Sequence, residues 1–258
     1  MAHPSELTLK PPSRLYTLAE GRALFELGAL FAARPLEQRL PEGDGHGVLC
    51  LPGFLASDRS FGPMQRFLKD RNYQAETWNQ GRNLGLREGL LEAMLDRVDE
   101  LADQTGDKIS LIGWSLGGIY ARELAKHKAD KVRFVIALGS PFTGPATATH
   151  AHKLYERLAG HSAENPPVEM DLEEVPPVPF TSLFTRTDGI VNWQTCIQKN
   201  GQAHDDYENI EIRASHCGIG VNPAAFYVIA DRLAQAEKEW EPFHLHGWRP
   251  LAFRKAAH

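Results

Sequence analysis

Cysteine is scarce in this chain of 258 residues, and positive charge is not clustered. The three cysteines include no Cys-x-x-Cys pair, so the sequence indicates neither a disulfide scaffold nor a zinc site of that type. The net charge is -5 and no long run of Lys or Arg occurs, so nothing attracts the chain to a phosphate backbone. We therefore expect no metal and no nucleic-acid partner.

The sequence also lacks a membrane-spanning stretch and a secretory signal. The apolar segment 24–36 is interrupted by Glu26 and Arg34, which makes it too short and too charged to span a bilayer. It is predicted instead to be an amphipathic helix packed on the domain. Residues 1–14 lack the charged start and apolar run of a signal peptide. We expect no stable membrane insertion and a cytoplasmic location, unless a signal has been removed.

Short apolar runs alternate with segments of helical periodicity along the rest of the chain. Composition is that of an ordinary globular protein, with 42% hydrophobic and 24% charged residues. Strands are predicted at 46–51, 73–78, 108–113, 132–138, 181–185 and 210–213, and the main helices at 86–105, 116–128 and 224–238. This alternation predicts an α/β fold with a mostly parallel central sheet covered by helices on both faces.

The length fits a single domain, 1–258, with its core at about 46–238. Seven prolines between 141 and 179 break the strand and helix pattern, so this region is predicted to be a small cap over the sheet edge. A solvated surface excursion is the alternative. The N-terminal segment 1–45 and the tail 239–258 flank the core. The tail's aromatic side chains favour docking on the protein's own surface over contact with lipid or a partner.

One glycine-rich turn lies between a predicted strand and a predicted helix, and it reads Gly113-Trp114-Ser115-Leu116-Gly117. A serine at the tip of such a turn has a strained backbone, and glycine at the flanking positions avoids Cβ clashes. Its hydroxyl would then stand at the carboxyl end of the sheet, beside free helix amides that stabilise an anion. Ser115 is therefore the candidate nucleophile, with an incidental serine as the alternative.

Two residues downstream qualify as the base for this serine and as the acid that orients the base. A serine hydroxyl is a poor nucleophile at neutral pH, so it needs a base whose tautomer is fixed by a third group. His216 follows the predicted strand 210–213, and Asp188 follows the predicted strand 181–185. Both are therefore expected at the sheet edge that carries Ser115. A surface histidine and an ordinary turn aspartate are the alternatives.

Backbone amides near this serine are the candidate oxyanion hole. One donor is expected to be the amide of Leu116, directly after the serine. The second should come from the turn 51–55, where Gly53 permits a tight bend. Phe54 is favoured as the second donor, and Leu55 stays open.

Four motifs together resemble the α/β-hydrolase superfamily, and within it bacterial serine esterases and lipases, from about 46 to 233. They are Leu51-Pro52-Gly53-Phe54, Gly113-Trp114-Ser115-Leu116-Gly117-Gly118, Thr187-Asp188-Gly189-Ile190-Val191 and Ser215-His216-Cys217-Gly218. Lipases often have His-Gly where this chain has Pro-Gly, which weakens assignment to a lipase subgroup.

The resemblance implies a catalytic triad of Ser115, Asp188 and His216 that cleaves small-molecule or lipid esters. An ester would acylate Ser115, and water activated through His216 would hydrolyse the acyl-enzyme without a metal or organic cofactor. The same residues would serve a thioesterase or an acyltransferase. A non-catalytic binding protein on the same fold is the alternative from another class.

The cysteines near the proposed base leave two alternatives. Cys196 and Cys217 would meet if the loops of Asp188 and His216 meet, and some bacterial lipases carry a disulfide in a similar place. Two free thiols are the other reading, and they fit the expected cytoplasmic location. Cys50 lies in an apolar run and is expected to be a buried free thiol.

Overall fold

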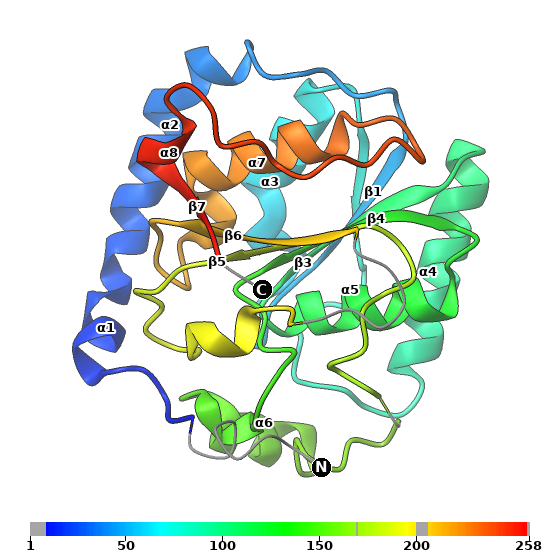
Figure 1. Cartoon of the computed structure of the whole chain (residues 1–258). Coiled ribbons are helices and arrows are strands. Elements are labelled where there is room, and N and C mark those ends of the chain that lie inside the picture. Colours follow the sequence, from blue (N-terminus) through cyan, green and yellow to red (C-terminus); the bar gives the residue numbers. More distant parts are fainter. Residues whose placement is uncertain (1–8, 169, 200–205, 257–258) are drawn as a thin grey trace.

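A single seven-stranded sheet forms the centre of the computed structural model, which describes residues 9–168, 170–199 and 206–256. The strand order is β2-β1-β3-β4-β5-β6-β7, and every neighbouring pair is parallel except β6 and β7 (Figure 1). The strands are β1 (Gly47–Leu51), β2 (Gln74–Thr77), β3 (Ile109–Trp114), β4 (Val132–Leu138), β5 (Phe180–Phe184), β6 (Tyr207–Ile212) and β7 (Phe253–Lys255). The predicted, mostly parallel sheet is confirmed.

Helices cover both faces of this sheet (Figure 1). They are α1 (Arg14–Leu18), α2 (Ala23–Glu37), α3 (Gly62–Asp70), α4 (Leu90–Thr105), α5 (Leu116–His127), α6 (His152–Ala159), α7 (Pro223–Leu233) and α8 (Arg249–Ala252). Short 3-10 helices lie at Ala19–Arg22, Asp58–Phe61, Ala146–Ala148, Trp193–Cys196 and Ile219–Val221. Among the described residues, no helix is long and apolar enough to cross a membrane.

Two large apolar cores result, one on each face of the sheet, and a smaller third cluster contains Phe184 and Cys196. Side chains of α2, α3 and α7 pack on one face, and those of α4 and α5 pack on the other. Central strands such as β4 are buried along their whole length, because both of their faces are covered. This arrangement leaves the loops after the strands at the carboxyl edge of the sheet as the place for a site.

Several boundaries differ from the prediction. Helix α7 begins as expected, with Asn222 capping the amide of Ala224, but it ends at Leu233 instead of 238. Beyond it Lys238 has a left-handed φ of 70°, which turns the chain back. Helix α3 was not predicted; its short apolar stripe packs Met64 and Phe67 into the core.

The tail 239–256 docks on the domain, as predicted, and adds the antiparallel strand β7. Phe243 and Phe253 are fully buried there, and Phe253 pairs in register with Ile212. A three-residue strand with two exposed charged side chains has no clear sequence signature, which is why pattern analysis missed it.

The predicted cap occupies the connection between β4 and β5, and α6 lies inside it. The buried Arg122 of α5 holds the cap segment that leads into β5, donating to the carbonyl oxygens of Leu172 at 3.1 Å and Glu174 at 2.8 Å. Residues 1–8 of the expected N-terminal segment, Glu169 of the cap and 257–258 of the tail lie outside the described residues.

Candidate active site

Ser115 occupies the turn between β3 and α5, with φ 53° and ψ -119°. A side chain rarely adopts this left-handed backbone, so the surrounding packing must hold it. A Cβ at Gly113 would collide with the carbonyl of Gly117, and a Cβ at Gly117 would collide with the carbonyl of Leu51. The two glycines therefore allow the turn to sit tightly against β1.

The structure brings Ser115, His216 and Asp188 together. The Nε2 atom of His216 lies 3.1 Å from the Oγ atom of Ser115, and its Nδ1 atom lies 2.7 Å from Oδ2 of Asp188. The other carboxylate oxygen of Asp188 accepts from the amides of Ile190 at 2.8 Å and Val191 at 2.7 Å. These bonds fix the carboxylate, so that it can orient the imidazole and leave Nε2 free to take a proton from the serine.

The environment of His216 favours its protonated form. Burial lowers the pKa of this histidine, but the charge of Asp188 and its hydrogen bond, together with the charge of Glu20, raise it above 6.5 overall. An imidazolium formed during a reaction would therefore be stabilised. As the pH falls, a histidine with a raised pKa becomes protonated at a higher pH than an ordinary histidine does. A protonated histidine cannot act as a base, so a base of this kind is lost at a higher pH than usual.

Glu20 is a site residue that sequence reasoning missed. Its side chain is buried and accepts from the amides of Gly189 at 2.8 Å, His216 at 3.1 Å and Cys217 at 2.8 Å. One carboxylate thus ties the loop of Asp188 to the loop of His216. It comes from the N-terminal segment, more than a hundred positions away in sequence, and no local motif marks it.

Two neighbours of Glu20 reinforce this link. Arg22 donates to the carbonyls of Thr187 at 2.6 Å and Ala214 at 2.9 Å, and Glu26 accepts from the amide of Ser215 at 2.7 Å. The N-terminal helices therefore clamp both loops from outside. In the sequence, Glu26 is visible only as a polar side chain that interrupts an apolar helical stretch. The pattern of that stretch predicts a helix packed on the domain and does not indicate contact with the site.

The two candidate oxyanion donors face the same region. Leu116 is the first residue of α5, where an amide has no partner within the helix. Leu55 donates its amide to the carbonyl of Asn83 at 2.7 Å, whereas no described residue accepts from the amide of Phe54. Of the two alternatives in this turn, the hydrogen bonding therefore favours Phe54.

Asn83 is a further missed residue, and it holds the turn that carries Phe54. It is fully buried, and its side-chain nitrogen donates to the carbonyl of Pro52 at 2.7 Å. Its Oδ1 atom accepts from the amide of Gly85 at 3.1 Å and from the hydroxyl of Tyr120 at 3.4 Å. An asparagine in a polar loop gives no sequence signal for such a role.

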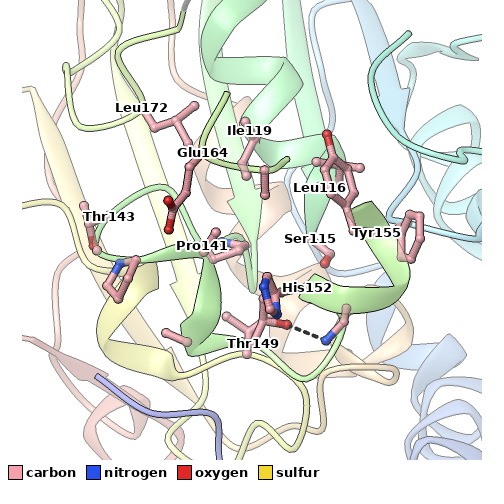
Figure 2. A pocket seen from close by; sticks show the side chains of 18 of the residues that line it. Ser115, Leu116, Ile119, Pro141, Thr143, Thr149, His152, Tyr155, Glu164 and Leu172 are labelled. Carbon is pink, nitrogen blue, oxygen red and sulfur yellow. Dashed lines mark hydrogen bonds between the residues drawn. The ribbon is translucent and has the colours of Figure 1, made fainter. Parts of the chain in front are cut away.

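A cavity of about 370 Å³ opens in front of Ser115, between the sheet edge and the cap. Figure 2 shows the side chains that surround it, with Tyr155 and His152 contributed by α6. Most of the lining is apolar, including Phe54, Leu116, Ile119, Pro141, Met170, Leu172, Ile190 and Val191. The cap therefore contributes directly to the cavity, which argues against a mere surface excursion.

The cysteines form no disulfide, so that alternative for Cys196 and Cys217 is wrong. Cys196 turns inward and packs among Phe184, Val191 and Ile197, whereas Cys217 is exposed. Partial desolvation of the sulfur and the nearby carboxylate of Glu20 raise the pKa of the Cys217 thiol to about 12, which disfavours its thiolate form. In the described part of the chain, no group of three or more His, Cys, Asp or Glu side chains could hold a metal ion.

A sequence model of the alpha/beta hydrolase family matches residues 48–257. The chain belongs to this family. Comparison with curated protein sequences finds no match. Solved structures of other alpha/beta hydrolases share its fold at low identity, so they support the architecture and not a particular activity.

Three such structures illustrate the likeness. Lipase B of Aspergillus fumigatus superposes with a TM-score of 0.59 at 16% identity over 75% of this chain, which spans only 54% of that protein. A pyrethroid hydrolase of Sphingobium faniae gives 0.54 at 16% identity, covering 73% and 97% of the two chains. A structure from the work on the metagenome-derived lipolytic enzymes LipS and LipT gives 0.55 at 13% identity, covering 75% and 93%.

Proposed function

We propose that this alpha/beta hydrolase cleaves carboxylic esters through an acyl-enzyme on Ser115. The observation that carries the proposal is the continuous relay from the hydroxyl of Ser115 through His216 to Asp188, at 3.1 Å and 2.7 Å, opening into an apolar cavity. The names of structural neighbours, a lipase, a pyrethroid hydrolase and lipolytic enzymes, agree with this reaction class, while their low identity leaves the geometry of the site as the main support.

In the first half of the reaction, Oγ of Ser115 attacks the ester carbonyl while Nε2 of His216 takes the hydroxyl proton. The amides of Phe54 and Leu116 donate to the carbonyl oxygen as it becomes an anion. The tetrahedral intermediate then collapses, the bond to the alcohol oxygen breaks, and His216 returns its proton to that oxygen. Alcohol leaves and the acyl group stays on Ser115.

In the second half, water attacks the acyl-enzyme. His216 takes one proton from the water, and the oxyanion forms again on the amides of Phe54 and Leu116. Collapse releases the carboxylic acid and returns the proton to Ser115. Asp188 keeps the imidazole in the required tautomer and stabilises its charge throughout.

The cavity indicates the kind of ester. Its volume of about 370 Å³ lies near the lower end of the range for small-ligand sites, and its lining favours an aliphatic or aromatic group over a charged one. We therefore propose an acyl ester of moderate size, from a small molecule or a lipid. Thioester cleavage and acyl transfer to an alcohol would use the same residues.

A fluorophosphonate probe tests the proposal, because it phosphonylates only an activated serine. The wild-type protein should label, and Ser115→Ala should not. Ser60→Ala, which removes an exposed hydroxyl elsewhere in the chain, is the matched control and should label normally. Absence of labelling in folded wild-type protein would refute the enzymatic function and favour a binding protein.

Rates on p-nitrophenyl esters from acetate to laurate then test the substrate class. Hydrolysis should be fastest for a chain of intermediate length, because the cavity limits the acyl group that fits. A thioester series under the same conditions separates esterase from thioesterase activity.

A further inference from the structure

The outer face of α2 is apolar, which is the reverse of an ordinary surface helix. Of its nine exposed residues, Arg34 is the only one with a charge. Leu24 is 76% exposed and Phe25 is 82% exposed. Glu26 lies in the first turn of α2 and points inward. It accepts a hydrogen bond from the amide of Ser215, in the loop of His216.

The same character extends through α1. Leu15 and Leu18 are 75% and 82% exposed, while the carboxylate between the two helices, Glu20, is buried. The described chain has thirteen exposed large apolar side chains, and seven of them lie between 15 and 36. We call this surface, formed by the exposed residues of 14–36, the outer face.

Every exposed charge along this segment is positive. Lys10, Arg14 and Arg34 are exposed, and residues 9–36 carry no exposed acidic side chain. Beside α2, a groove of about 760 Å³ has Phe25 in its lining and an excess of positive charge, with Arg22, Arg186, Arg213 and Arg254 against Glu26 and Glu211. Arg22 pairs with Glu26 and Arg186 pairs with Glu211. Arg213 and Arg254 remain as the surplus positive charge of the groove, with Arg254 opposite Glu211 in the β6–β7 register.

We propose that the outer face binds the surface of an anionic lipid bilayer. A helix with an apolar stripe bordered by cations lies in the plane of the interface, with its apolar side chains among the acyl chains and its cations at the headgroups. Helix α2 has 15 residues, about 22 Å, and does not cross the membrane. Binding is therefore peripheral.

The charge pattern favours a bilayer over a second copy of this chain. Two outer faces brought together would place their cations against one another, with no exposed acid on either side to compensate. The whole chain has a net charge of -5, which would repel an anionic bilayer. Salt screens charges that lie more than about 10 Å from the lipid, so the cations of the outer face dominate the interaction.

This surface lies beside the cap. Helix α1 and the cap helix α6 are at the same end of the molecule in Figure 1, and His150 of the cap donates to the carbonyl of Pro12 at 2.9 Å. Binding through the outer face thus brings the cover of the cavity near the lipid. The binding itself does not depend on the proposed hydrolysis.

Flotation with lipid vesicles tests the proposal, using phosphatidylcholine alone and phosphatidylcholine with about one third phosphatidylglycerol. Wild-type protein should float with the anionic vesicles and bind at least about tenfold less to the neutral ones. Leu18→Ser/Phe25→Ser should lower binding to anionic vesicles by about tenfold or more, because both side chains would leave the acyl region.

Two matched controls separate this face from general stickiness and charge. Leu154→Ser/Leu158→Ser removes two apolar side chains from α6, each 44% exposed, and should lower binding far less than Leu18→Ser/Phe25→Ser. Arg14→Gln/Arg34→Gln should bind several-fold less, whereas Lys128→Gln/Lys131→Gln, at the far end of α5 on the other face of the sheet, should not.

Thermal unfolding, which does not require the proposed hydrolysis, checks that Leu18→Ser/Phe25→Ser is folded. Equal loss of binding in the two apolar pairs, or undiminished binding in the outer-face pair, would overturn the assignment. Failure of wild-type protein to float, or concentration-dependent dimerisation lost in the outer-face pair, would replace the bilayer by a protein partner or a second copy.

Discussion

Replacement of Glu20 by glutamine tests whether the N-terminal segment acts on the chemistry as well as on stability. The glutamine oxygen can still accept from the amides of Gly189 and His216, but its amide group then faces the N–H of Cys217. One partly buried donor is left without an acceptor, at a cost of about 1–3 kcal/mol in unfolding free energy. For a domain of this size that lowers Tm by about 2–12 °C.

The charge change has a separate kinetic effect. The negative charge of Glu20 helps to raise the pKa of His216, so its removal lowers that pKa. The proposed base must be neutral to act, and the acid limb of kcat/KM should therefore move to lower pH in Glu20→Gln. Looser loops around Asp188 and His216 should also reduce the plateau of kcat, by about ten- to a hundredfold.

Glu26→Gln is the control for this experiment. It removes the same charge from the same segment and disturbs bonds to Ser215 and Asn222, but Glu26 is not among the groups that raise the pKa of His216. It should lower Tm and leave the acid limb in place. The pH profile of p-nitrophenyl butyrate hydrolysis and thermal unfolding give both readouts. If the two variants shift the acid limb equally, or neither shifts it, Glu20 only supports the fold.

Three other substitutions have defined outcomes. Asp188→Asn should lower kcat by about 10⁴-fold in the p-nitrophenyl butyrate assay, because the imidazole loses its orienting carboxylate; a drop below tenfold would remove Asp188 from the proposed triad. Asn83→Ala should lower the unfolding free energy by about 2–4 kcal/mol in urea titration and reduce kcat more than it changes KM, because the turn of Phe54 loses its support; unchanged kcat would mean that Phe54 is not an oxyanion donor. Arg122→Met should keep the sheet intact but release the cap segment 171–175, so limited proteolysis should cut there faster than in wild type; an unchanged cleavage pattern would show that other contacts hold the cap.

The sequence identified the parts of the site that follow from local rules. A glycine-flanked serine between a strand and a helix can adopt only a small set of backbone conformations, so Ser115 was recognisable from its neighbours. Parallel strands bring their carboxyl ends to one edge, so Asp188 and His216 could be placed there before their distances were known. Alternation of apolar runs was enough for the sheet itself.

Other features depended on contacts between distant parts of the chain. Glu20 and Asn83 have no motif, because their roles come from backbone amides and carbonyls that fold next to them. Proximity of the two loops allows a disulfide between Cys196 and Cys217, but both are free thiols. The side chain of Cys196 packs into an apolar cluster instead, and spacing along the sequence does not predict that direction.

The N-terminal helices show the same division most clearly. Periodicity alone determined that residues 24–36 form an amphipathic helix and do not span a membrane. Only the tertiary structure decided which side of that helix faces the protein: the buried carboxylates bind the loops of the site, and the apolar stripe is left outside. Hydrophobic patterning predicts that the apolar side of the helix faces inward. In the structure, Glu20 and Glu26 face inward instead, because they accept from backbone amides in the two loops that would otherwise be buried without a partner.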